Sequence, residues 1–107
     1  FPFILCSQNE KNIDSLVNVF KIQKNSTDKV KTAHDLFFYY KDTDPEKTLY
    51  YLHQGLTISK EINSKKDEAN FLKNIGYYYS LNRNIDSIKF YYDKSEKVYK
   101  ELKDTFY

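Results

Sequence analysis

Apolar residues recur at the spacing of an α-helix along most of this chain. Ile13, Leu16, Val17 and Phe20 stand at positions i, i+3, i+4 and i+7, which places all four on one face of a helix. The same period returns after each short polar stretch and predicts five helices. The first runs from Asn12, as its N-cap, to about Lys24, the second from about Asp28 to Lys41, the third from Pro45, the fourth after Ser64 and the fifth from Asn84.

Asp44, Pro45 and Glu46 form the clearest helix start in the sequence. An aspartate can accept hydrogen bonds from the free amides of the first turn, a proline has the φ angle of the first helical position, and a glutamate there faces the positive end of the helix. The third helix carries Leu52 on one apolar face and Ile58 on another. We therefore expect it to lie between two neighbouring helices.

The chain resembles itself at a spacing of 40 residues, when 35–60 is set against 75–100. Repeats of this length are typical of stacked helical hairpins, none of which buries its apolar face alone. The sequence therefore predicts an all-α fold of about five helices, stacked as antiparallel hairpins over residues 8–107, that binds another polypeptide. The matched pairs include Tyr39 with Tyr79, Tyr51 with Tyr91, Lys60 with Lys100 and Glu61 with Glu101.

Small residues mark the predicted contacts between helices. A glycine inside a helix costs about 1 kcal/mol relative to alanine, so Gly76 is expected to gain more from close approach of the following helix than it loses. Gly55 and Ser95 are expected to allow the same approach at the next helix along. The alternative at Gly76 is a hinge or a helix end.

Composition narrows the class of protein. The 107 residues suffice for one unit with a modest core, and two glycines and two prolines are too few for a turn-rich β fold. Charged residues make up 30% of the chain and hydrophobic residues 40%, a balance typical of a folded domain. The net charge is only +2, with lysines interspersed among acidic residues, so nucleic acid is not an expected partner.

The first seven residues, FPFILCS, are apolar and precede an abruptly polar stretch. They are interpreted as the remnant of a secretory signal peptide or, alternatively, as an apolar arm on the first helix. Lipidation at Cys6 is disfavoured because Leu5 is too large for that processing pattern. The sequence has no run of 18 apolar residues, so no direct membrane insertion is expected.

Residues 72–98 resemble the tetratricopeptide repeat (TPR). That family has a Leu/Ile-Gly pair, a tyrosine three residues later, a polar turn, and then a small residue after an aromatic one. Arg83 and Ile88 depart from the pattern. The Asn/Lys/Tyr-rich character also resembles the exported N-terminal repeat regions of sensor histidine kinases and helix-turn-helix regulators of Bacteroidetes-type bacteria. The matching positions are Ile75, Gly76, Tyr79, Asn84, Asp86, Tyr92 and Ser95.

The TPR resemblance implies a groove lined by the first helix of each hairpin, which binds a peptide or protein segment. It also implies a sensory or scaffolding input region of a larger signalling protein, on the periplasmic side of a bacterial envelope or, alternatively, in the cytoplasm. The repeat-packing positions are Gly55, Gly76, Tyr79, Tyr92 and Ser95. The expected groove residues are Ala33, His34, Phe37 and Tyr40 in the second helix and Lys73, Asn74, Tyr77 and Ser80 in the fourth.

Nothing in the sequence predicts catalysis, a metal site or a cofactor. His34 and His53 lie on different predicted helices, and no zinc or phosphate-binding motif is present. The alternative function is a self-associating scaffold or a small free-standing adaptor. A homodimer through the last helix is expected on that reading, because Leu102, Phe106 and Tyr107 have nothing after them to cover them.

Overall fold

Five helices make up the part of the chain that the structure describes, and the predicted all-α class is confirmed. The computed structural model describes the backbone of residues 2–81 and 85–106, and the side chains of residues 12–81 and 85–103. No strand occurs in these ranges. The helices are α1 (Pro2–Ile22), α2 (Thr27–Tyr40), α3 (Pro45–Glu61), α4 (Lys65–Leu81) and α5 (Ile85–Phe106).

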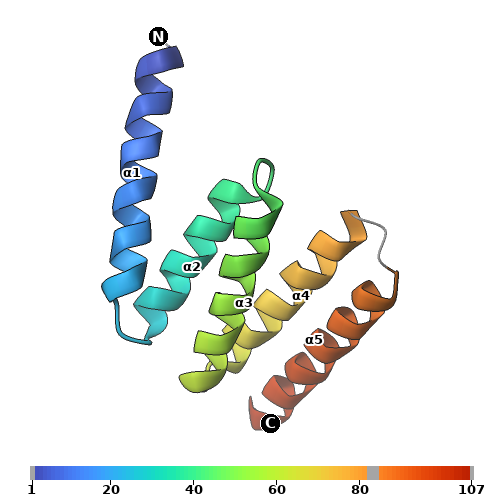
Figure 1. Ribbon diagram of the computed structural model, residues 1–107. Helices are drawn as coiled ribbons and strands as arrows, with labels where there is room; N and C mark the ends of the chain where they lie inside the picture. The colour runs from blue at the N-terminus through green and yellow to red at the C-terminus, as the bar shows by residue number, and fades with distance from the viewer. Residues whose placement is uncertain (1, 82–84, 107) are drawn as a thin grey trace.

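The helices pack mainly in chain order, each against the next (Figure 1). The molecule measures 51 × 34 × 20 Å and has a radius of gyration of 15.3 Å. A compact domain of this length would have a radius of gyration of about 13 Å. The fold is therefore an elongated row of helices, in which stability comes from contacts between neighbours.

Side-chain caps begin α2 and α3. Ser26 Oγ accepts a hydrogen bond from the Lys29 amide at 3.3 Å, and Asp44 Oδ1 accepts one from the Lys47 amide at 3.1 Å. Pro45 occupies the start of α3, as predicted. These bonds satisfy amides that have no partner within the helix and fix where each helix begins.

A three-residue connection, Ile62 to Ser64, turns the chain from α3 back along α4. Asn63 has a φ of 58°, in the left-handed region that asparagine tolerates better than most residues. The Asn63 amide donates to the Lys60 carbonyl at 3.1 Å, and the Ser64 amide donates to the Ser59 carbonyl at 2.9 Å. This pair of bonds is the Schellman motif, and it ends α3 sharply enough for α4 to follow at once.

The first helix is longer than the sequence predicts. It begins at Pro2 rather than at an N-cap on Asn12, which lies inside it. No glycine or proline interrupts residues 3–12, and proline suits the first helical position, so the chain offers no stop signal there. Figure 1 shows the N-terminal half of α1 standing clear of the other helices, while Phe20 near its C-terminal end is buried in the core.

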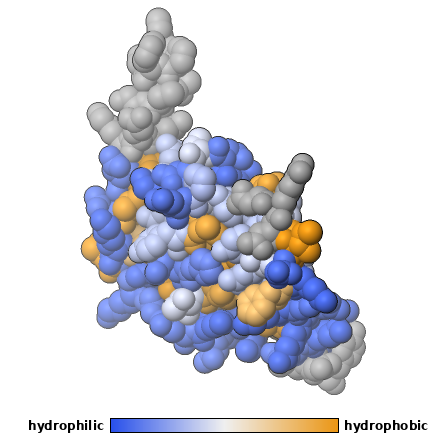
Figure 2. All heavy atoms as spheres, turned by 45° about the vertical axis from the view of Figure 1, so that its right-hand side comes forward, coloured by the Kyte–Doolittle hydropathy of each residue, from blue (hydrophilic) through white to orange (hydrophobic). Residues whose placement is uncertain are grey.

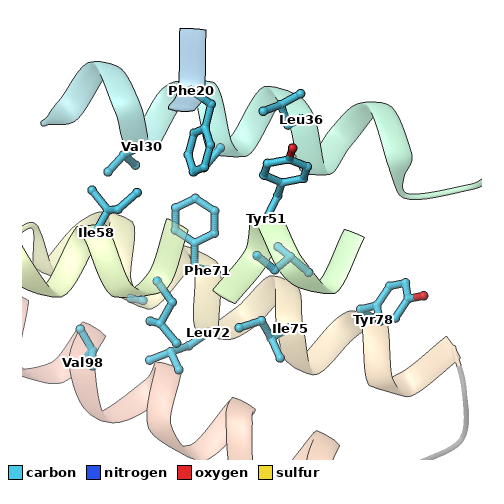
Figure 3. Packing of buried hydrophobic residues seen from close by; sticks show 14 residues of the cluster. Phe20, Val30, Leu36, Tyr51, Ile58, Phe71, Leu72, Ile75, Tyr78 and Val98 are labelled. Atoms are coloured by element: carbon cyan, nitrogen blue, oxygen red, sulfur yellow. The ribbon is translucent and has the colours of Figure 1, made fainter. Parts of the chain in front are cut away.

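The core lies between α2, α3 and α4. Figure 3 shows the ring of Phe71 in the middle of the cluster, with Phe20 and Tyr51 on one side and Leu72 and Ile75 on the other. α3 buries residues on both of its apolar faces, which confirms its predicted place between two helices. The core residues are Phe20, Val30, Ala33, Leu36, Tyr51, Leu52, Leu56, Ile58, Ala69, Phe71, Leu72, Ile75, Tyr78 and Val98.

The two glycines lie where neighbouring helices meet. A Cβ atom added to Gly55 in α3 would lie 2.3 Å from both Cε1 and Cζ of Phe71 in α4. A Cβ atom added to Gly76 in α4 would lie 3.2 Å from Tyr92 Cδ1 and 3.3 Å from Tyr91 Cβ in α5. The aromatic ring at Gly55 therefore occupies the space of a side chain, whereas the fit at Gly76 is tight without overlap.

The face that α5 turns toward α4 differs from the predicted one. The helical period predicts that Ile85, Ile88, Tyr92, Ser95, Tyr99 and Leu102 face inward. Ser95 is buried as expected, but Ile85 is 76% exposed and Tyr92 and Tyr99 are 37% and 38% exposed. The Tyr92 ring lies against Gly76 of α4 but stays partly exposed, while Tyr91 packs on the core, because its ring stacks on Tyr79 of α4 with centroids 5.7 Å apart. The face of α5 that packs on α4 is therefore rotated toward Tyr91, relative to the predicted face. Asn84, the expected start of this helix, lies outside the described residues.

Each hairpin contains a stacked pair of tyrosines. Tyr40 of α2 and Tyr51 of α3 lie 6.0 Å apart at an interplanar angle of 7°. Tyr79 of α4 and Tyr91 of α5 lie 5.7 Å apart at 18°. Tyr51 and Tyr91 correspond in the 40-residue repeat, but the partner of Tyr51 is Tyr40, one residue beyond the counterpart of Tyr79, so the two contacts are similar without being in the same register.

Gly55→Ala is expected to lower the free energy of unfolding by about 1–2 kcal/mol. Alanine favours a helix over glycine by about 1 kcal/mol, but a methyl group 2.3 Å from a buried ring overpacks the core severely and costs about 2–3 kcal/mol, the upper part of the usual range. Gly76→Ala is the matched control, and we expect it to change stability by less than about 1 kcal/mol, because the helix gain offsets a small adjustment of Tyr92. Urea unfolding measures both. A Gly55→Ala variant as stable as the natural chain would contradict the packing of Phe71.

Candidate functional site: the groove between α2 and α4

The surface between α2 and α4 contains a depression. These two helices stand on either side of a depression of about 410 Å³, which we call the larger hollow. Phe71 supplies buried apolar surface there, and polar side chains from both helices surround it. The lining residues are Thr27, Val30, Lys31, His34, Asp35, Asp67, Asn70, Phe71 and Asn74.

A second depression of about 90 Å³, the smaller hollow, continues along the same two helices. Asn74 borders both hollows and joins them into one surface, the α2/α4 groove. The smaller hollow is more aromatic than the larger one. Its lining residues are Phe37, Lys41, Asp42, Asn74, Tyr77, Tyr78 and Leu81.

Four of the expected groove residues lie together. His34 and Asn74 line the larger hollow, and Phe37, Asn74 and Tyr77 line the smaller one. Ala33, in contrast, is fully buried in the core. His34 and Phe37 on α2, like Asn74 and Tyr77 on α4, are three residues apart, which brings each pair to one face of its helix.

Tyr40 and Lys73 lie elsewhere. Tyr40 stacks on Tyr51 between α2 and α3, where the Lys47 ammonium lies 5.0 Å from its ring centroid. Lys73 points to the other side of α4 and lines a depression of about 410 Å³ between α4 and α5, the α4/α5 hollow, together with Tyr92 and Tyr99. Ser80 donates its hydroxyl proton to a carbonyl of its own helix and lines neither hollow of the groove.

Sequence reasoning missed several groove residues. Asp67, Asn70 and Phe71 line the larger hollow with Asn74, at positions i, i+3, i+4 and i+7 of α4. That spacing is the signal that could have found them, because residues so spaced share one face of a helix. Asp35 lies one residue from the predicted His34 and was not singled out.

Aromatic contacts hold His34 in the groove. Its ring lies 5.7 Å from Phe37, 6.3 Å from Phe38 and 6.4 Å from Phe71, measured between centroids. His34 and Phe71 therefore join α2 to α4 across the larger hollow. Hydrogen-bonding groups in the larger hollow include the amides of Asn70 and Asn74, the carboxylates of Asp35 and Asp67, and the hydroxyl of Thr27.

The described residues show no chemistry of a metal site. No group of three or more His, Cys, Asp or Glu side chains is placed to hold a metal ion in this part of the chain. His53, the second histidine, lies 6.3 Å from the Tyr91 ring, and burial lowers its pKa from the usual 6.5. Within the described residues, no helix combines the length and apolar character needed to cross a membrane.

Neither a protein-family model, nor a curated protein, nor a solved structure matches the chain. Evidence for a function therefore comes from the groove itself: its shape, its lining side chains and their charges.

His53 should make the protein less stable in mild acid. Because its pKa in the folded protein lies below 6.5, the unfolded chain binds more protons near and below that pH, and protonation favours unfolding. The stability that neutral His53 contributes is complete above pH 6.5 and is lost as the pH falls toward its folded-state pKa. We expect urea unfolding between pH 7.5 and 5 to show a steeper loss for the natural chain than for His53→Gln. Superimposable pH profiles would contradict this assignment.

Proposed function

We propose that the chain is a non-catalytic, TPR-like module that binds a segment of another protein in the α2/α4 groove. The single observation that carries this proposal is the groove itself, where two hollows meet at Asn74 and combine aromatic surface with polar side chains. Peptide-binding surfaces need both components, because apolar contacts supply affinity and hydrogen bonds fix the register of the bound chain.

The length of the groove favours a peptide over a small molecule. Its lining residues on α4 extend from Asp67 to Leu81, which corresponds to about 21 Å at 1.5 Å per helical residue. An extended segment of about six residues covers that distance.

Three features support the TPR-like part of the proposal. The helices pack in chain order, each hairpin contains a stacked tyrosine pair, and the sequence repeats at a spacing of 40 residues. Because such arrays present the first helices of successive hairpins on one surface, α2 and α4 are the pair from which a binding groove is expected.

The cellular setting is also part of the proposal. On the strength of the sequence resemblance, we place the module in the sensory or scaffolding input region of a larger signalling protein, exported to the periplasmic side of a bacterial envelope. In that setting a bound protein segment would be the signal, or the component being assembled. The alternative setting is a cytoplasmic adaptor.

Selection of peptides from a random 12-residue display library tests the groove. Tyr77 lines the smaller hollow and is 58% exposed, so Tyr77→Lys should disturb binding without disturbing the core. Tyr50→Lys is the matched control, because Tyr50 is 53% exposed on α3 and lines neither hollow. We expect selected peptides to bind Tyr77→Lys at least tenfold more weakly than the natural chain, and Tyr50→Lys equally well, by fluorescence anisotropy.

Either of two results would contradict the proposed peptide site. If the library yields no binders, or if both tyrosine variants bind the selected peptides as tightly as the natural chain, the groove is not a peptide site. Circular dichroism spectra of the two variants should match that of the natural chain, which ensures that weakened binding reflects the surface and not unfolding.

Self-association through α5 is the second candidate function, and one observation favours it. Tyr92 and Tyr99 are partly exposed beside the α4/α5 hollow, and Phe90 of the same helix is 51% exposed. Figure 2 shows that hydrophilic residues cover most of the face it displays, with hydrophobic residues scattered between them. An interface here would therefore depend on a few aromatic side chains within a polar surround.

The second candidate predicts a dimer that Tyr99→Lys weakens, because a lysine ammonium would have to be buried against its partner. Sedimentation equilibrium from about 5 to 500 μM, a range that brackets weak dimers, measures this directly, with Tyr50→Lys again as the control. A monomer at every concentration would remove self-association from consideration.

A further inference from the structure

The two halves of the α2/α4 groove differ in chemistry. The larger hollow has an aromatic floor, made by Phe71 and His34, with carboxylates from both helices around it. The smaller hollow is lined mainly by Phe37 of α2 and by Tyr77, Tyr78 and Leu81 of α4. A segment that fills both halves therefore has to present two different side chains.

Negative charge predominates in the larger hollow. Asp35 of α2 and Asp67 of α4 line it, and Lys31 is the one cation among the described residues that do so. Asp67 Oδ2 accepts the Ser64 hydroxyl at 2.6 Å, but no ion pair within the described residues engages either carboxylate. Both carboxylates are thus available to a ligand.

A lysine or arginine side chain fits this arrangement. Its methylene stem can lie on the partly exposed ring of His34, while its charged end reaches the carboxylates at the rim. Lys41 cannot reverse the charge of the groove, because its ammonium lies 3.8 Å from Asp42 Oδ2 and 4.6 Å from the Phe38 ring centroid.

The distance between the hollows sets the spacing of the two side chains. Asn70 in the larger hollow and Tyr77 in the smaller one are seven residues apart on α4, about 10.5 Å along the helix. A chain in the extended polyproline II conformation covers about 9 Å in three residues and, with three residues per turn, brings the third side chain back to the same side. Asn74 lies between them, and its amide can donate to and accept from the backbone of the residues that cross it.

From this geometry we infer that the α2/α4 groove selects an extended segment with a lysine or arginine in the larger hollow and, three residues away, an aromatic or large aliphatic side chain in the smaller hollow. The inference rests on the proposed function and specifies its ligand class. The segment belongs to a partner protein with a basic and apolar surface sequence.

NMR titration of the ¹⁵N-labelled chain tests the inference with two peptides, acetyl-GSKSSFSG-amide and acetyl-GSESSFSG-amide, which differ in one charge. We expect the lysine peptide to bind at least fivefold more tightly, with shifts at Asp35, Asn74 and Tyr77. Because the selectivity is electrostatic and partly exposed, raising the salt from 50 to 500 mM should reduce the difference between the peptides, since such salt concentrations screen exposed charges.

Charge-neutralising variants locate the selectivity. Asp35→Asn should weaken the lysine peptide about three- to tenfold and leave the glutamate peptide unchanged or slightly tighter, as expected when one charge-assisted hydrogen bond is lost at an exposed rim. Asp93→Asn is the matched control, because Asp93 is likewise exposed in the middle of a helix but lies on α5, away from the groove. It should bind both peptides as the natural chain does.

The possible outcomes distinguish a wrong ligand class from a wrong binding site. Equal binding of both peptides with shifts in the groove, or display-selected groove binders that lack a basic residue, would overturn the inference and leave the proposed function standing. A preference for the glutamate peptide that Lys31→Gln abolishes would likewise overturn it. Groove shifts that depend on protein concentration alone would replace the peptide with a second copy of the chain. Selected peptides that all bind outside the groove would overturn both proposals.

Discussion

The packing of Phe71 against Gly55 determines how α3 and α4 meet. A Cβ atom on residue 55 would lie 2.3 Å from the ring, so the ring rests directly on the backbone of α3. Phe71 is only 2% exposed and stands in the middle of the buried cluster, where side chains of α1, α3 and α4 surround it. The loss of helix propensity at this glycine, about 1 kcal/mol, is offset by burial of a whole aromatic side chain.

The same ring connects the core to the surface that we propose as a binding site. Phe71 reaches the larger hollow beside His34 of α2, so the contact that joins α3 to α4 also forms part of the floor between α2 and α4. α2 and α4 both pack on α3, and a depression remains between them. A groove formed in this way is as rigid as the core beneath it, which favours binding because little order has to be imposed on the protein.

The helices could be predicted because their ends depend on contacts between residues close in sequence. The buried face of a helix could not always be predicted, because neighbouring residues can have the same hydropathy. The cap at Asp44 fixes the start of α3 because the hydrogen bond is formed by residues adjacent in sequence. Tyr91 and Tyr92 have the same hydropathy, so periodicity could not decide which one α5 turns inward, and contact with α4 decides it. In the groove, Asn74 was predicted and found, but its neighbour Lys73 faces α5, because successive residues of a helix point about 100° apart. The charge of the groove could not be predicted, since it depends on bringing two helices together.

The nuclear Overhauser spectrum of the labelled chain tests the central packing most directly. The account predicts cross-peaks from the Gly55 α-protons to the ring protons of Phe71, an upfield ring-current shift of those α-protons, and cross-peaks between the rings of Phe71 and His34. If the Phe71 ring protons instead show contacts to α5 and none to Gly55 or His34, then α3 and α4 pack differently, and the floor of the groove is not where the structure places it.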